Sequence, residues 1–241
     1  MSLYIPPSCK LMLPMVKSLV EESKLVDSQD WQHDLTVEVE ARLGRLVDGV
    51  FVPGVSADLY STVLKALRAC AKWEAVVTDE MCVDYFFTHG GGSYRTRMSK
   101  SESGITIQKS KLQTQTFQMC TQRDCAHRFD IRVSLATESV VQDTPFAVQP
   151  DRVRIKRRNQ FRYKTWLFDL STVWTGTSFS EVEARAHSEN PDSFEVELEC
   201  SSVSEAYSKH NNNPTYIALS LILKCMDFIS LEYNYFTFVP K

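Results

Sequence analysis

Apolar and charged residues alternate along the middle of the chain, most clearly in two segments. In residues 36–44 (TVEVEARLG), Val37, Val39 and Leu43 alternate with charged side chains, and residues 193–200 (SFEVELEC) repeat the pattern. Successive side chains of a β-strand point to opposite faces of its sheet. Each segment therefore predicts a strand with one apolar and one charged face.

Six more segments have the length and the turn boundaries of strands. They are 74–88, 93–99, 104–119, 128–141, 151–163 and 164–174. Turn sequences such as HGGGS and SENPD lie between strand segments. Eight strands with short connections predict a mainly β protein with flanking helices, built on a closed antiparallel barrel.

Helical spacing of apolar residues appears outside this β region. Residues 9–24 predict a short amphipathic helix that Pro14 limits. Residues 56–70 predict a second helix, in which Ser56 is the N-cap.

A third helical region follows the last strand. Ser202 and Glu205 have the spacing of a capping-box pair, and helical periodicity then continues to about residue 231. We expect the helices to cover the outside or one mouth of the barrel. On this interpretation residues 1–241 form a single catalytic domain, with the barrel strands between about 36 and 200.

The distribution of charge is more informative than its sum, because the 241-residue chain carries a net charge of only −3. Seven basic residues lie between Arg152 and Lys164. Three of them, Arg154, Lys156 and Arg158, occupy alternate positions and so share one face. The cations assigned to such faces are Arg42, Arg95, Arg97, Lys109, Arg154, Lys156 and Arg158. The acids assigned to them are Glu38, Glu40, Glu138, Asp169, Glu195, Glu197 and Glu199.

These charged faces can point in either of two directions. On a barrel with an ordinary apolar core they face water, which is the simpler interpretation of any single strand. Like charges within one strand repel each other, however, and surface sheets usually mix the two signs. The density of like charge therefore favours a charged barrel interior, although each buried ion then needs a partner or a ligand.

A charged interior of this kind suits one chemistry. Glutamates from two strands form a hard-oxygen site that fits Mg²⁺ or Mn²⁺. Neighbouring arginines and lysines fit the oxygens of a polyphosphate chain, and a further carboxylate could position a water for in-line attack. The combination predicts a metal-dependent phosphohydrolase.

Other signals exclude competing classes. No G-x-x-x-x-G-K-[ST] loop occurs, and the HGGG segment at 89–92 has no accompanying G-x-S-x-G elbow, so neither a P-loop enzyme nor an esterase is indicated. No secretory signal is evident, and the apolar stretch 216–231 is interrupted by Lys224 and Asp227. We therefore expect an intracellular protein with no membrane partner.

Five segments resemble strands of a known family. VEVEARLG and FEVELE resemble the first and last glutamate strands of the tunnel-type RNA triphosphatases, the metal-dependent mRNA-capping enzymes of fungal and protozoan type. RIKRR is similar to the family's R-x-K-x-R strand, IRVSLATE to its strand ending in a catalytic glutamate, and FDLSTV to its I-D-L-T-x-V segment. The segments follow the family's order and span about residues 36–200.

The resemblance implies an eight-stranded tunnel barrel with a role for each charged residue. Glu38, Glu40 and Glu199 would ligate the metal, Mg²⁺ or Mn²⁺, and Glu138 would be the general base that orients water. The residues implied to hold the triphosphate, and so to take part in catalysis, are Arg97, Lys109, Arg154, Lys156 and Arg158, with Arg95 as a further contact. The residues implied to support the site from behind these groups are Arg42, Asp169, Glu195 and Glu197.

The sequence departs from the family pattern at a few positions. Leu167 stands where family members often carry an arginine, so one phosphate contact is absent or is supplied by Arg132 or Lys111. Ser171 replaces a threonine and Leu43 an aromatic residue. The guanylyltransferase-binding extension of the fungal enzymes is not visible.

The implied reaction removes the γ-phosphate from the 5′-triphosphate of nascent mRNA, with hydrolysis of nucleoside triphosphates as a side activity. The resemblance also implies a nuclear location and functional coupling to a separate guanylyltransferase. Two alternatives stay open: a tunnel phosphohydrolase for free nucleotides or inorganic triphosphate, and a non-catalytic module that binds polyphosphate or RNA 5′ ends. The two glutamate strands argue against the second, since an anion pocket gains nothing from carboxylates unless a metal bridges them.

Overall fold

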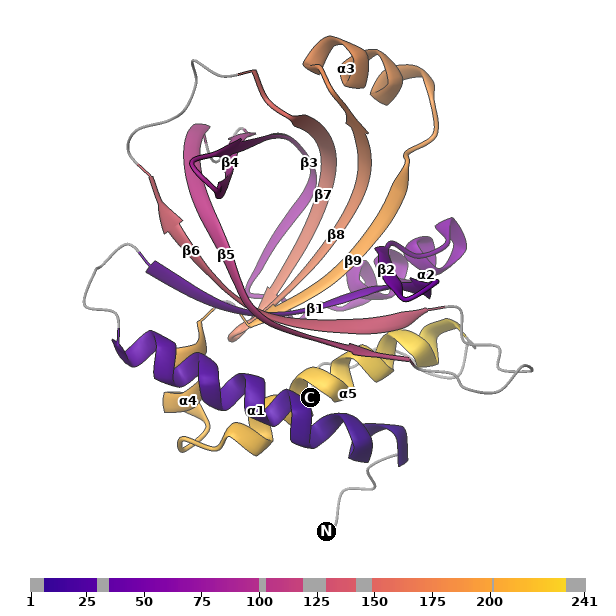
Figure 1. The fold of residues 1–241 in the computed structure, drawn as a ribbon. Coiled ribbons are helices and arrows are strands. Elements are labelled where there is room, and N and C mark those ends of the chain that lie inside the picture. The colour runs from indigo at the N-terminus through magenta and orange to yellow at the C-terminus, as the bar shows by residue number, and fades with distance from the viewer. Residues whose placement is uncertain are drawn as a thin grey trace.

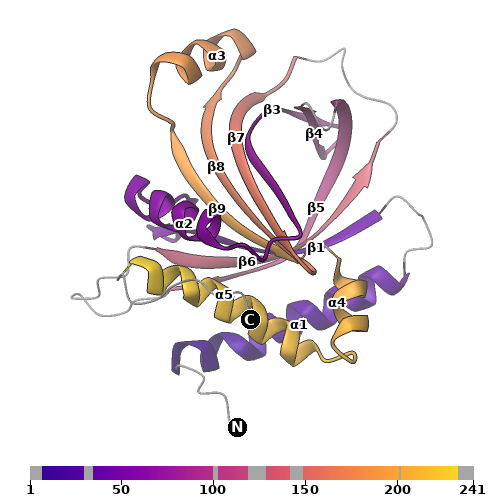
Figure 2. The same cartoon turned by 180° about the vertical axis from the view of Figure 1, so that it is seen from behind.

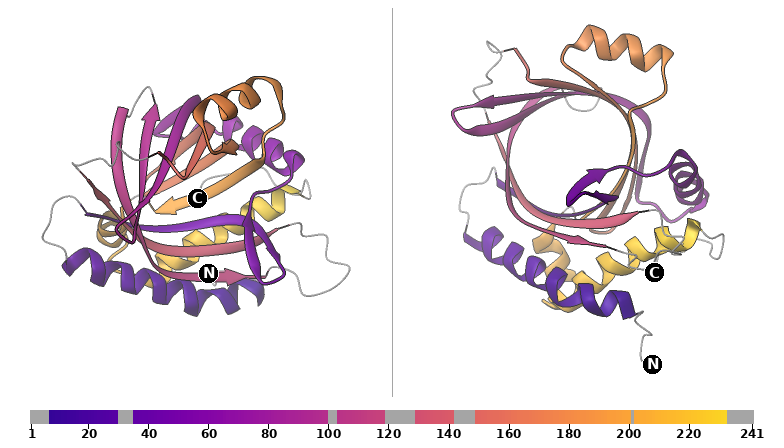
Figure 3. Two further views of the ribbon diagram at one scale, coloured as in Figure 1. Left: turned by 45° about the horizontal axis from the view of Figure 1, so that its top comes forward. Right: turned by 45° about the vertical axis from the view of Figure 1, so that its right-hand side comes forward.

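Eight antiparallel strands close into a barrel in the computed structural model of the chain (Figures 1 and 3). The structure describes residues 7–29, 35–99, 103–118, 129–141, 149–200 and 202–232. The strands are β1 (Leu35–Val47), β2 (Val50–Pro53), β3 (Ala75–His89), β4 (Gly92–Ser99), β5 (Ser103–Phe117), β6 (Asp130–Val140), β7 (Arg152–Tyr163), β8 (Trp166–Gly176) and β9 (Ser193–Cys200). Around the barrel the order is β1-β6-β5-β4-β3-β7-β8-β9, and β9 pairs again with β1. The predicted fold class is confirmed.

The short strand β2 is not part of this ring. It pairs only with the far end of β1, where Gly44 lies opposite Pro53 and Val47 opposite Val50. The sequence analysis did not predict it. Its four residues are too few to show a periodic pattern.

The apolar faces of the strands point outward, and the charged faces point into the barrel. On β1, Val37, Val39, Ala41 and Leu43 are buried in an apolar core shared with the helices. The core therefore lies between the outer wall of the barrel and the helices, while a barrel of this size normally has an apolar interior. This inversion is what the alternating pattern predicted.

The helices cover the outside of the barrel (Figures 1 and 2). They are α1 (Pro7–Gln29), α2 (Ala57–Ala69), α3 (Phe179–Ser188), α4 (Val203–Lys209) and α5 (Pro214–Glu232). The helices α1, α4 and α5 pack together along one side, and Phe228 of α5 meets Phe168 of β8 edge-on, with 6.0 Å between ring centroids. The predicted caps are confirmed, because Ser56 accepts from the Leu59 amide and Ser202 from the Glu205 amide. Among the described helices, none is long and apolar enough to cross a membrane.

Two helical features differ from the sequence expectation. The helix α1 continues through Pro14, because its buried residues Met12, Val16 and Leu19 pack into the common core on both sides of the proline. The helix α3 was not predicted, although Ser178 caps it by accepting from the Glu181 amide. It covers a small separate apolar cluster on β7 and β8 at the opposite end of the barrel from α1 (Figure 1).

Candidate active site

The barrel encloses a tunnel of about 500 Å³ that is lined by charged side chains from all eight of its strands. The right-hand view of Figure 3 looks into the barrel, and the strands form a ring. The lining includes thirteen of the fourteen charged residues that the sequence assigned to an interior face. The fourteenth, Glu195, lies within the wall and is only 2% exposed.

One wall of the tunnel is acidic. Glu38 and Glu40 extend from β1, and Glu199 on β9 lies directly opposite Glu40 in the strand register. Glu138 on β6 completes the group. The ammonium group of Lys109 lies among these acids, with its Nζ 2.6 Å from Glu38 Oε2 and 3.1 Å from Glu138 Oε1.

The electrostatics of this wall show how crowded its negative charge is. Burial and the neighbouring carboxylates of Glu38 and Glu40 raise the pKa of Glu199 to about 8. Burial also raises the pKa of Glu38, although Lys109 opposes the shift. Burial disfavours the charge of Lys109, but Glu38, Glu40 and Glu138 outweigh it and raise the pKa of the lysine. The acids therefore require a cation, and without a ligand Lys109 supplies it.

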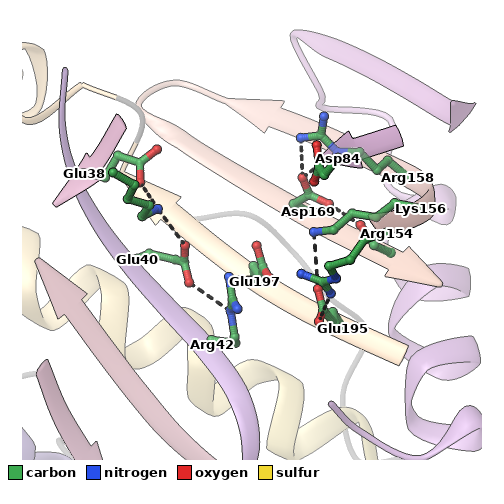
Figure 4. Close-up of polar contacts among 12 residues, drawn as sticks. Glu38, Glu40, Arg42, Asp84, Arg154, Lys156, Arg158, Asp169, Glu195 and Glu197 are labelled. Carbon is green, nitrogen blue, oxygen red and sulfur yellow. Dashed lines mark hydrogen bonds and ion pairs between the residues drawn. The ribbon is translucent and has the colours of Figure 1, made fainter. Parts of the chain in front are cut away.

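The other wall is basic, and its β7 cations are held by acids on β8 and β9 (Figure 4). Glu195 on β9 accepts from Arg154 Nη2 at 2.5 Å and from Lys156 Nζ at 3.3 Å. Arg158 donates from Nε at 3.1 Å and from Nη2 at 2.7 Å to the same oxygen of Asp169. These contacts fix the direction of all three cations of β7, each of which faces the tunnel.

Asp169 and Arg42 each hold several polar side chains of the site. Asp169 also accepts from Gln160 and Ser171, each at 2.9 Å, so its carboxylate is held by three side chains from two strands. Arg42 contacts Glu40 at 3.0 Å and Glu197 at 2.7 Å. The supporting role that the resemblance implied for both residues stays a prediction.

The sequence analysis missed Asp84, which pairs with a cation of the site. It is fully buried, and it accepts two hydrogen bonds from Arg97, at 2.7 and 3.0 Å. Burial disfavours the Asp84 charge, but Arg97 reverses the effect and holds the pKa of the carboxyl far below its usual range. A signal was present in the sequence: a two-residue hairpin turn at Gly90–Gly91 places position 84 opposite position 97. Arg152, Gln160 and Arg162 also line the tunnel and were not assigned to it.

A divalent cation fits the donor set of the acidic wall. No three acidic, histidine or cysteine side chains of the described residues are already arranged as a metal site. The wall nevertheless offers carboxylate oxygens alone, which are the ligands that Mg²⁺ and Mn²⁺ prefer. Among the described residues Glu199 has no ion pair within 4.0 Å, and it lies beside carboxylates that raise its pKa. A cation there would add to the compensation that Lys109 gives this group of acids.

A closed antiparallel barrel with an acidic and a basic inner wall defines a class of protein, the triphosphate tunnel enzymes. The family described as "mRNA capping enzyme, beta chain" matches residues 70–220. The chain belongs to this family, whose members are RNA triphosphatases of the tunnel type.

Solved structures share the fold. The S. pombe Pct1 RNA triphosphatase superposes with a TM-score of 0.62 at 17% identity, covering 94% of this chain and 93% of that one. The RNA triphosphatase domain of a trifunctional Mimivirus capping enzyme superposes with a TM-score of 0.51 at 10% identity, covering 83% and 94%. No curated protein sequence matches the chain. At these identities the structural likeness supports the fold, and the family match carries the activity.

Proposed function

We propose that this RNA triphosphatase removes the γ-phosphate from the 5′-triphosphate end of nascent mRNA with the help of Mg²⁺ or Mn²⁺. The observation that carries the proposal is the pairing of an acidic and a basic wall in one tunnel. Tunnel triphosphatases are generally metal-dependent. The two walls of this chain give separate places for a cation and for a chain of phosphates.

The basic wall would hold the triphosphate. Arg154, Lys156 and Arg158 follow one another along β7, and Arg97 and Arg95 extend into the tunnel from β4, which β3 separates from β7. Charge-assisted hydrogen bonds from guanidinium groups are short and directional, so these residues fix the position of the phosphates as well as neutralising them. Asp84, Asp169 and Glu195 keep the donors aimed at the tunnel by accepting from them on the other side.

The acidic wall would hold the cation through Glu38, Glu40 and Glu199. A bound divalent cation supplies a Lewis acid that polarises a phosphoryl oxygen and neutralises charge on the phosphates. Glu197 lies behind these ligands, where it contacts Arg42 at 2.7 Å.

Glu138 is placed to orient the attacking water. Its Oε1 lies 3.1 Å from Lys109 Nζ and 3.4 Å from Arg95 Nη2, so the carboxylate is held at the boundary between the two walls. From there it could accept a proton from water as the bond to the γ-phosphate breaks. The two cations fix its direction.

The contacts of the tunnel would be with phosphates, and this gives two further expectations. Free nucleoside triphosphates should be side substrates, because no base-specific group is needed to hold their phosphates. The diphosphate-ended RNA product is the substrate of a guanylyltransferase, so we infer coupling to such an enzyme and a nuclear location. The S. pombe Pct1 RNA triphosphatase has been solved in complex with the Spt5 CTD.

The direct test measures phosphate release from RNA labelled at its γ-phosphate. Wild-type protein should release only the γ-phosphate, and only when Mg²⁺ or Mn²⁺ is present. Loss of a general base typically costs about 10²–10⁴-fold in rate, so Glu138→Gln should lose turnover to that extent while still binding triphosphate-ended RNA.

Arg157→Gln is the matched control, because Arg157 lies on β7 but points away from the tunnel, over the ring of Trp174. It should retain wild-type turnover. A folded wild-type protein that released no phosphate with any divalent cation would overturn the proposal.

A further inference from the structure

Arg132 and Arg152 line the tunnel but have no role in the chemistry described above. Arg132 extends from β6, where it lies opposite Arg42. Arg152 is the first residue of β7 and lies opposite Phe86. Within the part of the chain that the structure describes, neither arginine has an acidic partner within 4.0 Å.

Both arginines lie at the same mouth of the tunnel. β1 leaves the barrel at this end through Gly44 into β2, β7 begins here, and the helix α3 connects β8 to β9 here (Figures 1 and 3). The charge of Glu195 acts on both Arg132 and Arg152, as expected for two guanidinium groups at one end of the tunnel. They therefore flank one opening.

Each guanidinium rests on an aromatic ring. Arg132 lies over Phe51 with 4.5 Å between its central carbon and the ring centroid, and Arg152 lies over Phe86 at 4.3 Å. Such contacts hold a planar cation in place while leaving its outer face available. The Nε of Arg132 is buried and makes no hydrogen bond among the described residues.

The position of Phe51 depends on a glycine. Gly44 continues the tunnel-facing series of β1, and a Cβ at this position would lie 2.5 Å from the Phe51 ring and 2.4 Å from the Val52 carbonyl oxygen. Only glycine lets the β2 hairpin bring the ring so close to the mouth. The Phe51 ring under Arg132 is therefore held in place by the local fold of the β1–β2 hairpin.

The mouth has more positive charge than its acids balance. Burial and the nearby Arg42 lower the pKa of Arg132, and burial and the nearby Arg154 lower the pKa of Arg152. Glu195, an acid whose charge acts on both arginines, already accepts from Arg154 and Lys156. An anion at this mouth would relieve the repulsion between the cations.

The opposite end of the tunnel is different. Beyond the acidic wall and Asp169, its lining includes the neutral residues Ile105, Gln160 and Leu167, together with Arg162. A chain of phosphates that left the tunnel between Arg132 and Arg152 would meet two cations that each stack on an aromatic ring.

We propose that the RNA leaves the tunnel between Arg132 and Arg152, and that these two arginines hold the first phosphodiesters and bases after the 5′-triphosphate. Each guanidinium group lies on an aromatic ring, and its other face can pair with phosphate oxygens or stack on an unpaired base. Proteins make both kinds of contact with single-stranded RNA. The two residues thus make the site favour RNA over free nucleotides. This inference rests on the proposed function, because it names the path of that reaction's substrate.

The first experiment measures binding of a fluorescent six-nucleotide RNA with a 5′-triphosphate, by anisotropy in EDTA over a range of salt concentrations. A plot of log K against log[salt] has a negative slope, and each lost phosphate contact lowers the magnitude of that slope by about 0.7 for single strands. We expect Arg132→Gln and Arg152→Gln each to lower the slope by about 0.7, and the double variant by about 1.4. Arg157→Gln removes the same charge from the outer face of β7 and should leave the slope at its wild-type value.

The second experiment compares kcat/KM for the same RNA and for ATP. Hydrogen bonds to charged groups contribute enough for the double variant to lower the RNA-to-ATP ratio about tenfold or more. Arg132→Lys keeps the charge but loses the flat guanidinium, so it should fall between wild type and Arg132→Gln. Arg152 is exposed, so its variant should fold even if the Arg132 variant does not.

The outcomes separate the two proposals. If wild-type protein cleaves neither substrate, the proposed function fails, and the binding experiment in EDTA still decides the RNA path. If wild-type protein cleaves both substrates and the double variant lowers both kcat/KM values in equal proportion, the RNA path is wrong and the triphosphatase assignment stands. A double variant with the wild-type salt slope would likewise overturn the RNA path.

Discussion

Glu199 allows a test of the acidic wall that needs no substrate. Its pKa is raised from 4.5 to about 8 by burial and by the surrounding acids. The charged groups that face it are Glu38 and Glu40 on β1, Lys109 on β5 and Glu138 on β6. Because the folded state binds this proton more tightly than the unfolded chain, Glu199 contributes stability below about pH 4.5 that is lost as the pH rises through 8.

The size of the effect follows from the shift in pKa. Each unit corresponds to about 1.4 kcal/mol, so the full shift sets an upper limit of about 5 kcal/mol. Water in the tunnel screens part of the repulsion, and we expect about 2–3 kcal/mol. The Glu199→Gln side chain resembles the protonated glutamate, so the variant should not show the loss of stability that ionisation of Glu199 causes.

The assay compares the free energies of unfolding of wild type and Glu199→Gln in urea at pH 5.0 and 8.5, with EDTA present. The two proteins should be about equally stable at pH 5.0, and the variant should be more stable at pH 8.5. The corresponding difference in Tm is about 5–10 °C for a chain of this size. Mn²⁺ at pH 8.5 should stabilise wild type more than the variant. An identical difference between the two proteins at both pH values would refute the reasoning, because other titrating groups are common to both.

Two further predictions concern stability. Asp84→Ala leaves the Arg97 guanidinium without its buried partner and should lower the free energy of unfolding in urea by about 3–5 kcal/mol. The double variant Asp84→Leu with Arg97→Met should recover most of this loss. If the changes in unfolding free energy at the two positions simply added, the prediction would be contradicted. Leu221→Ala, at a site 1% exposed between helix and barrel, should cost about 2–5 kcal/mol, while Leu11→Ala, at a site 79% exposed, should change stability by less than about 0.5 kcal/mol.

The sequence was enough to assign the strands and most of the tunnel lining, because the side-chain period of a strand is two. Once alternation marked one face of β7 as charged, the inward direction of Arg154, Lys156 and Arg158 followed without knowledge of any partner strand. The prediction of a charged barrel interior followed in turn from the density of like charge within single strands.

The pairing of these charges depends on register, which alternation does not determine. That Glu195 holds Arg154 and Lys156 follows from how β7, β8 and β9 align, and this alignment joins segments about forty residues apart. Asp84 was missed for a related reason. Its neighbours on the same face of β3, Cys82 and Phe86, are not charged, so only the hairpin with Arg97 reveals its role.

The barrel is stabilised mainly from outside, and this is why its interior can carry so much charge. Buried ion pairs contribute little net stability, because the cost of removing both charges from water offsets their attraction. The contacts of Asp84, Asp169 and Glu195 therefore mainly orient side chains. Burial of apolar residues between the strands and α1, α2, α4 and α5 provides the driving force for folding. Because the apolar core lies outside the barrel and the charged site inside it, a residue of the lining can change, as at Leu167, without any change to the core that closes the barrel.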